Sequence, residues 1–110
     1  MPDSSTAARA ARNESVFREL NEQLEAAAPG GPSDVKGFVC ECADMSCTAV
    51  LAVPLGEYES IRANPQRFVV APEEIHVDLT VERIVERRPA YWVVEKIGLA
   101  GEIAEELDTE

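Results

Sequence analysis

Basic residues are scarce in this sequence, and long apolar runs are missing. The chain has 10 Lys and Arg against 21 Asp and Glu, a formal net charge of −11 at pH 7. Proteins that bind nucleic acids concentrate Lys and Arg, so this balance argues against a nucleic-acid partner and against anionic membrane surfaces. No apolar run approaches the ~20 residues that span a bilayer. The acidic balance favours solubility or a basic protein partner.

Motifs for catalysis are also missing. The sequence holds no P-loop, no G-x-G-x-x-G and no serine nucleophile motif. The H-x-E…C-x-x-C pattern of the zinc deaminases is absent as well. The single histidine, His76, leaves little for a Ser–His or Cys–His mechanism once it binds a metal. We therefore expect a protein that is not an enzyme.

The N-terminal residues lack the apolar core of a signal peptide. The first twelve residues are polar and alanine-rich, with Arg9 and Arg12 among them. This predicts a cytoplasmic protein, in a compartment where thiols stay reduced. The odd number of cysteines, 3, likewise favours metal ligation over structural disulfides.

All 3 cysteines of the chain are clustered, at Cys40, Cys42 and Cys47. Residues two apart on a strand point to the same face, so Cys40 and Cys42 can present both sulfurs on one side. Residues 43–46 are short and polar enough to form a turn that returns Cys47 to the first pair. With His76 these thiols make a complete tetrahedral Cys3His set. The spacing therefore predicts one structural Zn²⁺ per chain.

Other interpretations of the same residues stay open. The cysteines also fit a redox-active thiol cluster without metal, or inert thiols that behave as small hydrophobes. If His76 is not the fourth ligand, Asp44, Glu41 or a water molecule takes its place. A zinc enzyme would need a general base, for which Glu41, Glu73 and Glu74 are the nearby candidates.

The chain is long enough for one domain and small enough to benefit from a metal staple. We expect a disordered N-terminus over residues 1–6, a helix over 7–28, a Pro/Gly linker over 29–34, a metal-stapled domain over 35–107 and an acidic tail over 108–110. Val16, Leu20 and Leu24 fall four apart, and this apolar stripe predicts a helix packed on the domain. Use of the helix for a partner or for dimerisation is the alternative.

The pattern along the domain predicts an α+β fold. It comprises the N-terminal helix and a small antiparallel sheet of about four or five strands with a short inserted helix. The expected strands cover residues 35–42, 48–53, 68–70, 79–87 and 91–97, the inserted helix covers 55–63, and a helical turn covers 103–107. Trp92, the largest apolar side chain, is expected in the core.

Several segments together resemble a known family. They are residues 11–22, 38–42 with Cys47, 57–59 with Arg62, 67–72 with His76, and 91–96. In combination they resemble a family of small uncharacterised proteins of actinobacterial type, and the similarity spans nearly the whole chain. The resemblance implies the same Cys3His ligand set and no particular activity. The chain departs from the family inside the turn, where Ala43 and Met45-Ser46 stand in place of a Gly and a Pro-Gly.

These observations predict a small soluble zinc-binding protein with a structural Cys3His site. Its expected role is that of a protein-interaction or regulatory module with another protein as partner. A thiol/zinc redox sensor is the alternative, and a zinc-dependent enzyme is a further one.

Overall fold

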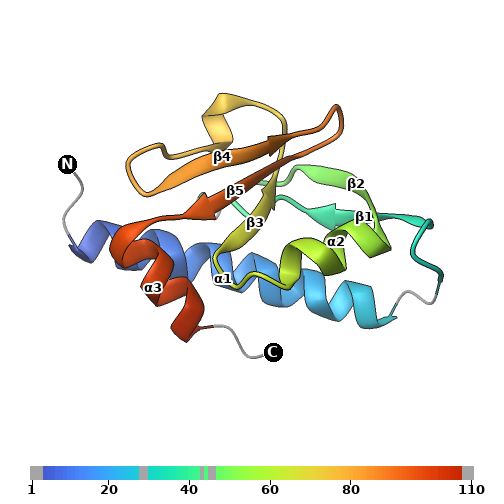
Figure 1. Ribbon diagram of the computed structural model, residues 1–110, viewed down its shortest axis with the longest axis horizontal. Coiled ribbons are helices and arrows are strands. Elements are labelled where there is room, and N and C mark those ends of the chain that lie inside the picture. Colours follow the sequence, from blue (N-terminus) through green and yellow to red (C-terminus); the bar gives the residue numbers. More distant parts are fainter. Residues whose placement is uncertain (1–3, 28–29, 43, 45–46, 108–110) are drawn as a thin grey trace.

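A computed structural model describes residues 4–27, 30–42, 44 and 47–107 of the chain. The elements follow in the order α1 (Ser4–Ala27), β1 (Val35–Val39), β2 (Val50–Pro54), α2 (Leu55–Arg62), β3 (Arg67–Val70), the 3-10 helix η1 (Glu74–His76), β4 (Glu82–Arg87), β5 (Trp92–Lys96) and α3 (Gly98–Glu106). The predicted α+β class is confirmed, with an N-terminal helix and a short helix inserted between strands (Figure 1).

The five strands form two antiparallel sheets rather than the single sheet that was expected. One sheet pairs β1 with β2, and the other has the order β3-β5-β4. The division falls at Pro54, which ends β2 and leads directly into α2. Proline fixes φ, here at −60°, and helix α2 begins at the next residue, so the chain leaves the first sheet at this point. The second sheet is then built from residues that follow α2.

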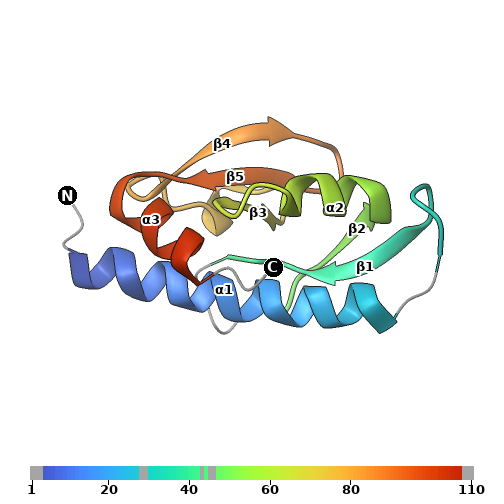
Figure 2. The ribbon, with the colours of Figure 1, turned by 60° about the horizontal axis from the view of Figure 1, so that its bottom comes forward.

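The helices enclose a core between the sheets. In both views α1 runs along the length of the molecule beneath the sheets, with α3 packed against it (Figures 1 and 2). The rings of Phe38 and Tyr58 stack inside the core with centroids 4.3 Å apart. The buried hydrophobic side chains of the strands include Phe38, Leu51, Val53, Phe68, Val69, Val70, Val93 and Val94. Burial of these side chains is the main favourable term for the fold.

Over residues 15–27, where its side chains are described, helix α1 packs on the domain through polar groups, and the prediction that its apolar stripe does so is wrong. Val16, Leu20 and Leu24 are 52%, 41% and 38% exposed, whereas Arg18 and Asn21 are buried. The guanidinium of Arg18 lies 3.7 Å from the centroid of the Phe68 ring, a cation–π contact. It also donates a hydrogen bond of 2.7 Å to the backbone oxygen of Arg67. A hydrogen bond and a cation–π contact therefore hold the face with Arg18, rather than the apolar stripe, against the domain.

Asn21 makes the second directed contact of α1. Its side-chain oxygen accepts a hydrogen bond from the Val39 N–H, and its side-chain nitrogen donates one to the Val39 oxygen, both at 2.8 Å. The amide thus satisfies the outward-facing backbone groups of β1 as a neighbouring strand would. Further along the helix, Glu22 forms an ion pair with Arg62 of α2. Hydrogen bonds and charge thus fix α1 against the first sheet and α2.

Several predicted boundaries differ from the structure. Helix α1 begins at Ser4, inside the segment expected to be disordered; residues 1–3 and the acidic tail over 108–110 lie outside the described residues. Helix α3 begins at Gly98 instead of near residue 103, because Gly98 adopts a φ of 56° that lets the chain turn out of β5. Trp92, expected in the core, is half-buried: it packs against the core, and the Arg87 guanidinium lies over its ring. Within the described ranges, no helix is long and apolar enough to cross a bilayer.

The polar packing of α1 can be tested with two substitutions on opposite faces of the helix. Asn21→Ala leaves both Val39 backbone groups without partners and should lower the free energy of unfolding by about 3 kcal/mol. Val16→Ala, on the exposed stripe, should change it by less than about 0.5 kcal/mol. Urea-induced unfolding of each variant measures both values. A larger loss for Val16→Ala than for Asn21→Ala would contradict the packing described.

Candidate metal centre

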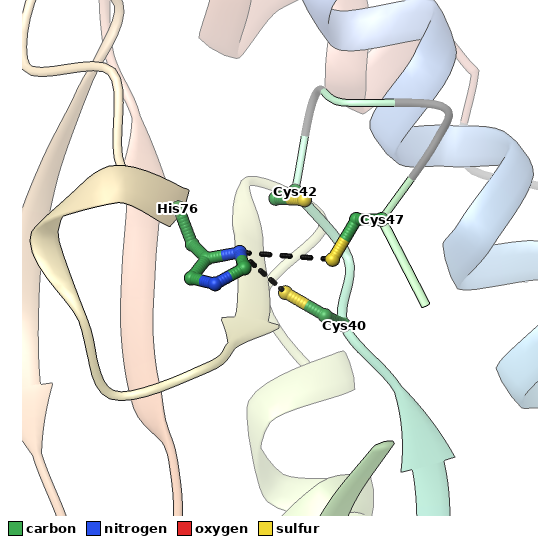
Figure 3. Close-up of side chains that lie close together, drawn as sticks. All are labelled: Cys40, Cys42, Cys47 and His76. Atoms are coloured by element: carbon green, nitrogen blue, oxygen red, sulfur yellow. Dashed lines mark hydrogen bonds between the residues drawn. The ribbon is translucent and has the colours of Figure 1, made fainter. Parts of the chain in front are cut away.

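The four predicted ligands come from three loop segments that the fold brings together. Cys40 and Cys42 directly follow β1, Cys47 precedes β2, and His76 is the last residue of η1 in the connection between β3 and β4. The Cys40 N–H donates to the Ala49 oxygen at 3.0 Å, which continues the ladder between β1 and β2. The sulfurs and the imidazole point toward one another in Figure 3.

The donor atoms of Cys40, Cys42, Cys47 and His76 all lie within 4.8 Å of one another. His76 Nδ1 is 3.7 Å from the Cys40 sulfur and 3.6 Å from the Cys47 sulfur (Figure 3). A tetrahedral zinc ion with bonds of ~2.3 Å to sulfur and ~2.0–2.1 Å to nitrogen would separate these donors by about 3.6 Å. These two sulfur–nitrogen separations match the edges of such a tetrahedron. The cluster is therefore compatible with a metal site.

The three thiols differ in burial and in protonation. Cys40 and Cys42 are buried, and Cys47 is half-buried. A hydrogen bond with Cys40 lowers the pKa of Cys42, and the same bond raises the pKa of Cys40. Burial raises the pKa of Cys47. Cys42 is therefore the first of the three to become a thiolate, the form that binds metals.

A backbone group also faces the cluster. The N–H of Ala71, just after β3, donates a hydrogen bond of 3.2 Å to the Cys40 sulfur. Such a donor stabilises negative charge on sulfur and fixes its orientation. On the other side of the ring, His76 Nε2 lies 3.8 Å from a carboxylate oxygen of Glu73. The Ala71 N–H thus already orients one of the four donors, the Cys40 sulfur.

Glu41 does not belong to the cluster, and its interpretation as a fourth ligand or general base is wrong. Because successive side chains alternate, Glu41 points away from the face that carries Cys40 and Cys42. Its carboxylate accepts hydrogen bonds from Asn21 Nδ2 at 2.9 Å and from the Tyr58 hydroxyl at 2.8 Å. The side chain is fully buried, and burial raises its pKa.

Glu41 also attaches the Cys-x-Cys segment to β3. Its backbone N–H donates to the Val69 oxygen at 2.7 Å, and its carboxylate accepts from the Val69 N–H at 2.9 Å. This residue therefore links α1, α2 and β3 directly behind the thiols. Sequence reasoning missed this role, because it depends on contacts with α1, α2 and β3.

A small cavity lies beside the cluster. Its volume is about 160 Å³, and its polar lining comprises Cys42, Asp44, His76, Asp78 and Glu82. Glu82 is paired with Lys96, but the carboxylates of Asp44 and Asp78 at this opening favour the approach of cations and disfavour anionic ligands. The cavity therefore provides a chemically suitable approach for a metal ion.

No protein-family model, no curated protein and no solved structure matches the chain. The chemistry of the cluster therefore has to be inferred from its donor set and geometry. The resemblance to a family of small actinobacterial-type proteins stays a prediction.

The role of Glu41 can be tested through its tyrosine donor. Tyr58→Phe removes the hydroxyl that donates to the buried Glu41 carboxylate and should lower the free energy of unfolding by about 2 kcal/mol. Tyr91→Phe is the matched control, because the Tyr91 hydroxyl donates to Glu57, whose side chain is 40% exposed. Its loss should cost less, since water can replace the hydroxyl. Equal losses in chemical unfolding would contradict a central role for Glu41.

Proposed function

We propose that Cys40, Cys42, Cys47 and His76 hold one structural Zn²⁺ ion, and that the protein is a non-catalytic interaction or regulatory module. The observation that carries the proposal is the separation of His76 Nδ1 from the Cys40 and Cys47 sulfurs, 3.7 and 3.6 Å. Thiolates and imidazole are soft and borderline donors, and zinc accepts both in a tetrahedral site. When bound, the ion would supply a cross-link of four bonds and no redox chemistry.

The cross-link would hold a segment, η1, that has no buried residue. None of the three residues of η1 is buried, and Ile75 is 87% exposed. The segment therefore has little apolar surface with which to hold itself against the rest of the domain. A metal ion would join His76 to the loop that connects β1 and β2, and so tie the two sheets together. Folding and metal binding would then be coupled.

A structural role is favoured over a catalytic one by the completeness of the donor set. Catalytic zinc sites keep a position open for water or substrate, whereas four protein ligands close the site. The adjacent cavity is small and lined by carboxylates, which suits few substrates. We accordingly propose a module whose partner is another protein, with a basic surface that complements the net charge of −11.

A thiol/zinc redox sensor is the second candidate, and the half-buried Cys47 supports it. A peroxide could oxidise two of the clustered thiols to a disulfide, and the two electrons with two protons would reduce hydrogen peroxide to two water molecules. Loss of two sulfur ligands would release the ion. The reducing conditions of a cytoplasmic location, which we also propose, would make such a change reversible.

Metal content of the purified chain tests the structural proposal. Protein prepared under reducing conditions should carry one zinc ion per chain by native mass spectrometry and elemental analysis. Cys47→Ser and His76→Ala should each lose the ion and unfold at lower temperature. Ile75→Ala is the matched control, since Ile75 is exposed beside His76 and should retain both zinc and stability. A folded wild-type chain that binds no metal would overturn the proposal.

Treatment with peroxide distinguishes a redox sensor from a purely structural zinc site. The sensor predicts release of zinc at micromolar peroxide, formation of one disulfide, and recovery of zinc binding after reduction. A purely structural site predicts that zinc stays bound under the same treatment. A zinc-binding dye measures the released zinc, and mass spectrometry of alkylated peptides detects the disulfide.

A further inference from the structure

Three of the four outer strand edges in the two sheets are protected. At β1, helix α1 runs alongside and Asn21 occupies both backbone groups of Val39 (Figure 2). At β3, Glu41 occupies both backbone groups of Val69. Strand β4 carries Glu82, Arg83, Glu86 and Arg87, with a shift in register between Ile84 and Glu86. Charged residues and bulges are devices that prevent the pairing of edges.

Between Val50 and Val53 the outer edge of β2 has none of these devices, and Pro54 blocks only the last position of the strand. Its sequence, Val50–Pro54, contains no charged residue. Val50 is 69% exposed, and Ala52 is exposed as well. Within the described ranges, no side chain or other element forms a hydrogen bond with the backbone of Val50 or Ala52. This edge therefore remains open to another strand.

The register shows which backbone groups the edge presents. Val39 pairs with Val50, and Gly37 pairs with Ala52. Since Asn21 reaches the Val39 backbone from outside the sheet, the Val39–Val50 pair is one without mutual hydrogen bonds. Along an antiparallel ladder, hydrogen-bonded pairs alternate with pairs that lack mutual hydrogen bonds. The Gly37–Ala52 pair, two residues along from Val39–Val50, therefore also lacks them. The N–H and C=O groups of Val50 and Ala52 therefore point away from β1.

We propose that the β2 edge pairs with the β2 edge of a second copy of this chain. In an antiparallel arrangement about a two-fold axis at Leu51, Val50 of one copy faces Ala52 of the other. Each residue then donates to and accepts from its counterpart, which satisfies the open backbone groups on both copies. Strands β1 and β2 of the two copies join into one continuous antiparallel sheet.

Charge and symmetry favour a second copy over a foreign strand. The residues that share the outer face of the first sheet are all uncharged: Val35, Gly37, Val39, Val50, Ala52 and Pro54. In a chain with a net charge of −11, this is a surface on which two copies meet without opposing acidic groups. An antiparallel strand edge is also complementary to itself, as a two-fold interface requires. This association is separate from the proposed metal site, because the strand pairing involves none of the metal ligands.

Light scattering after size exclusion tests the association with the full metal-loaded chain. A mass of twice the 12.0 kDa chain is expected at high protein concentration. Added salt should shift the equilibrium toward the dimer, because it screens the repulsion between acidic copies. Binding of a basic foreign strand would instead weaken with salt. A monomer at every concentration and salt level would overturn the proposal.

Substitutions locate the interface. Ala52→Pro removes the outward-pointing N–H without touching the ladder to β1 and should give a monomer, whereas Ala52→Ser keeps the N–H and should remain dimeric. Val50→Glu places a charge at the same edge and should also give a monomer if the proline variant fails to fold. Leu20→Glu, on the exposed stripe of α1, should leave the dimer intact. Metal content measured in parallel separates the failure of this proposal from failure of the metal site.

Amide hydrogen exchange gives the decisive local measurement. The Val50 and Ala52 amides should exchange slowly in the dimer and rapidly on dilution to the monomer. Rapid exchange in a dimer, or a dimer that Leu20→Glu abolishes, would assign the contact to α1 and overturn the edge pairing.

Discussion

The rest of the structure depends on one buried carboxylate, that of Glu41. It accepts hydrogen bonds from Asn21 of α1, Tyr58 of α2 and the Val69 N–H of β3. Burying a charged or polar group costs free energy unless its partners are present, so these three elements must be in place together. Removal of any one donor leaves the carboxylate under-satisfied. This shared requirement explains why a largely polar helix face packs against the core.

The position of Glu41 between Cys40 and Cys42 connects this network to the candidate metal centre. The alternation of side chains places the carboxylate on one side of the segment and both sulfurs on the other. The carboxylate therefore fixes the backbone from behind, and the Ala71 N–H fixes the Cys40 sulfur from the side. The thiols are held in place by hydrogen bonds to the fold, while His76 arrives on a segment with few buried contacts. A metal ion would join the thiols of the connection between β1 and β2 to His76 in the connection between β3 and β4.

Much of this arrangement could be predicted from local sequence. The spacing of Cys40, Cys42, Cys47 and His76 was enough to predict a cluster, because the donor types are rare in the chain and strand alternation aligns the first pair. The face of α1 could not be predicted, since apolar periodicity assumes packing by burial, and Arg18 and Asn21 act through directed bonds. The division into two sheets and the role of Glu41 depend on contacts with β3, far along the chain. Long-range pairing of this kind leaves no local signal.

X-ray absorption at the zinc edge of the purified chain tests the central claim most directly. The account predicts a first shell of three sulfur atoms at ~2.3 Å and one nitrogen atom at ~2.0–2.1 Å. His76→Ala should abolish zinc binding and with it the absorption signal of the site. A shell dominated by oxygen, or one with fewer than three sulfur atoms in the wild-type chain, would contradict a Cys3His site and with it the metal cross-link between the two sheets.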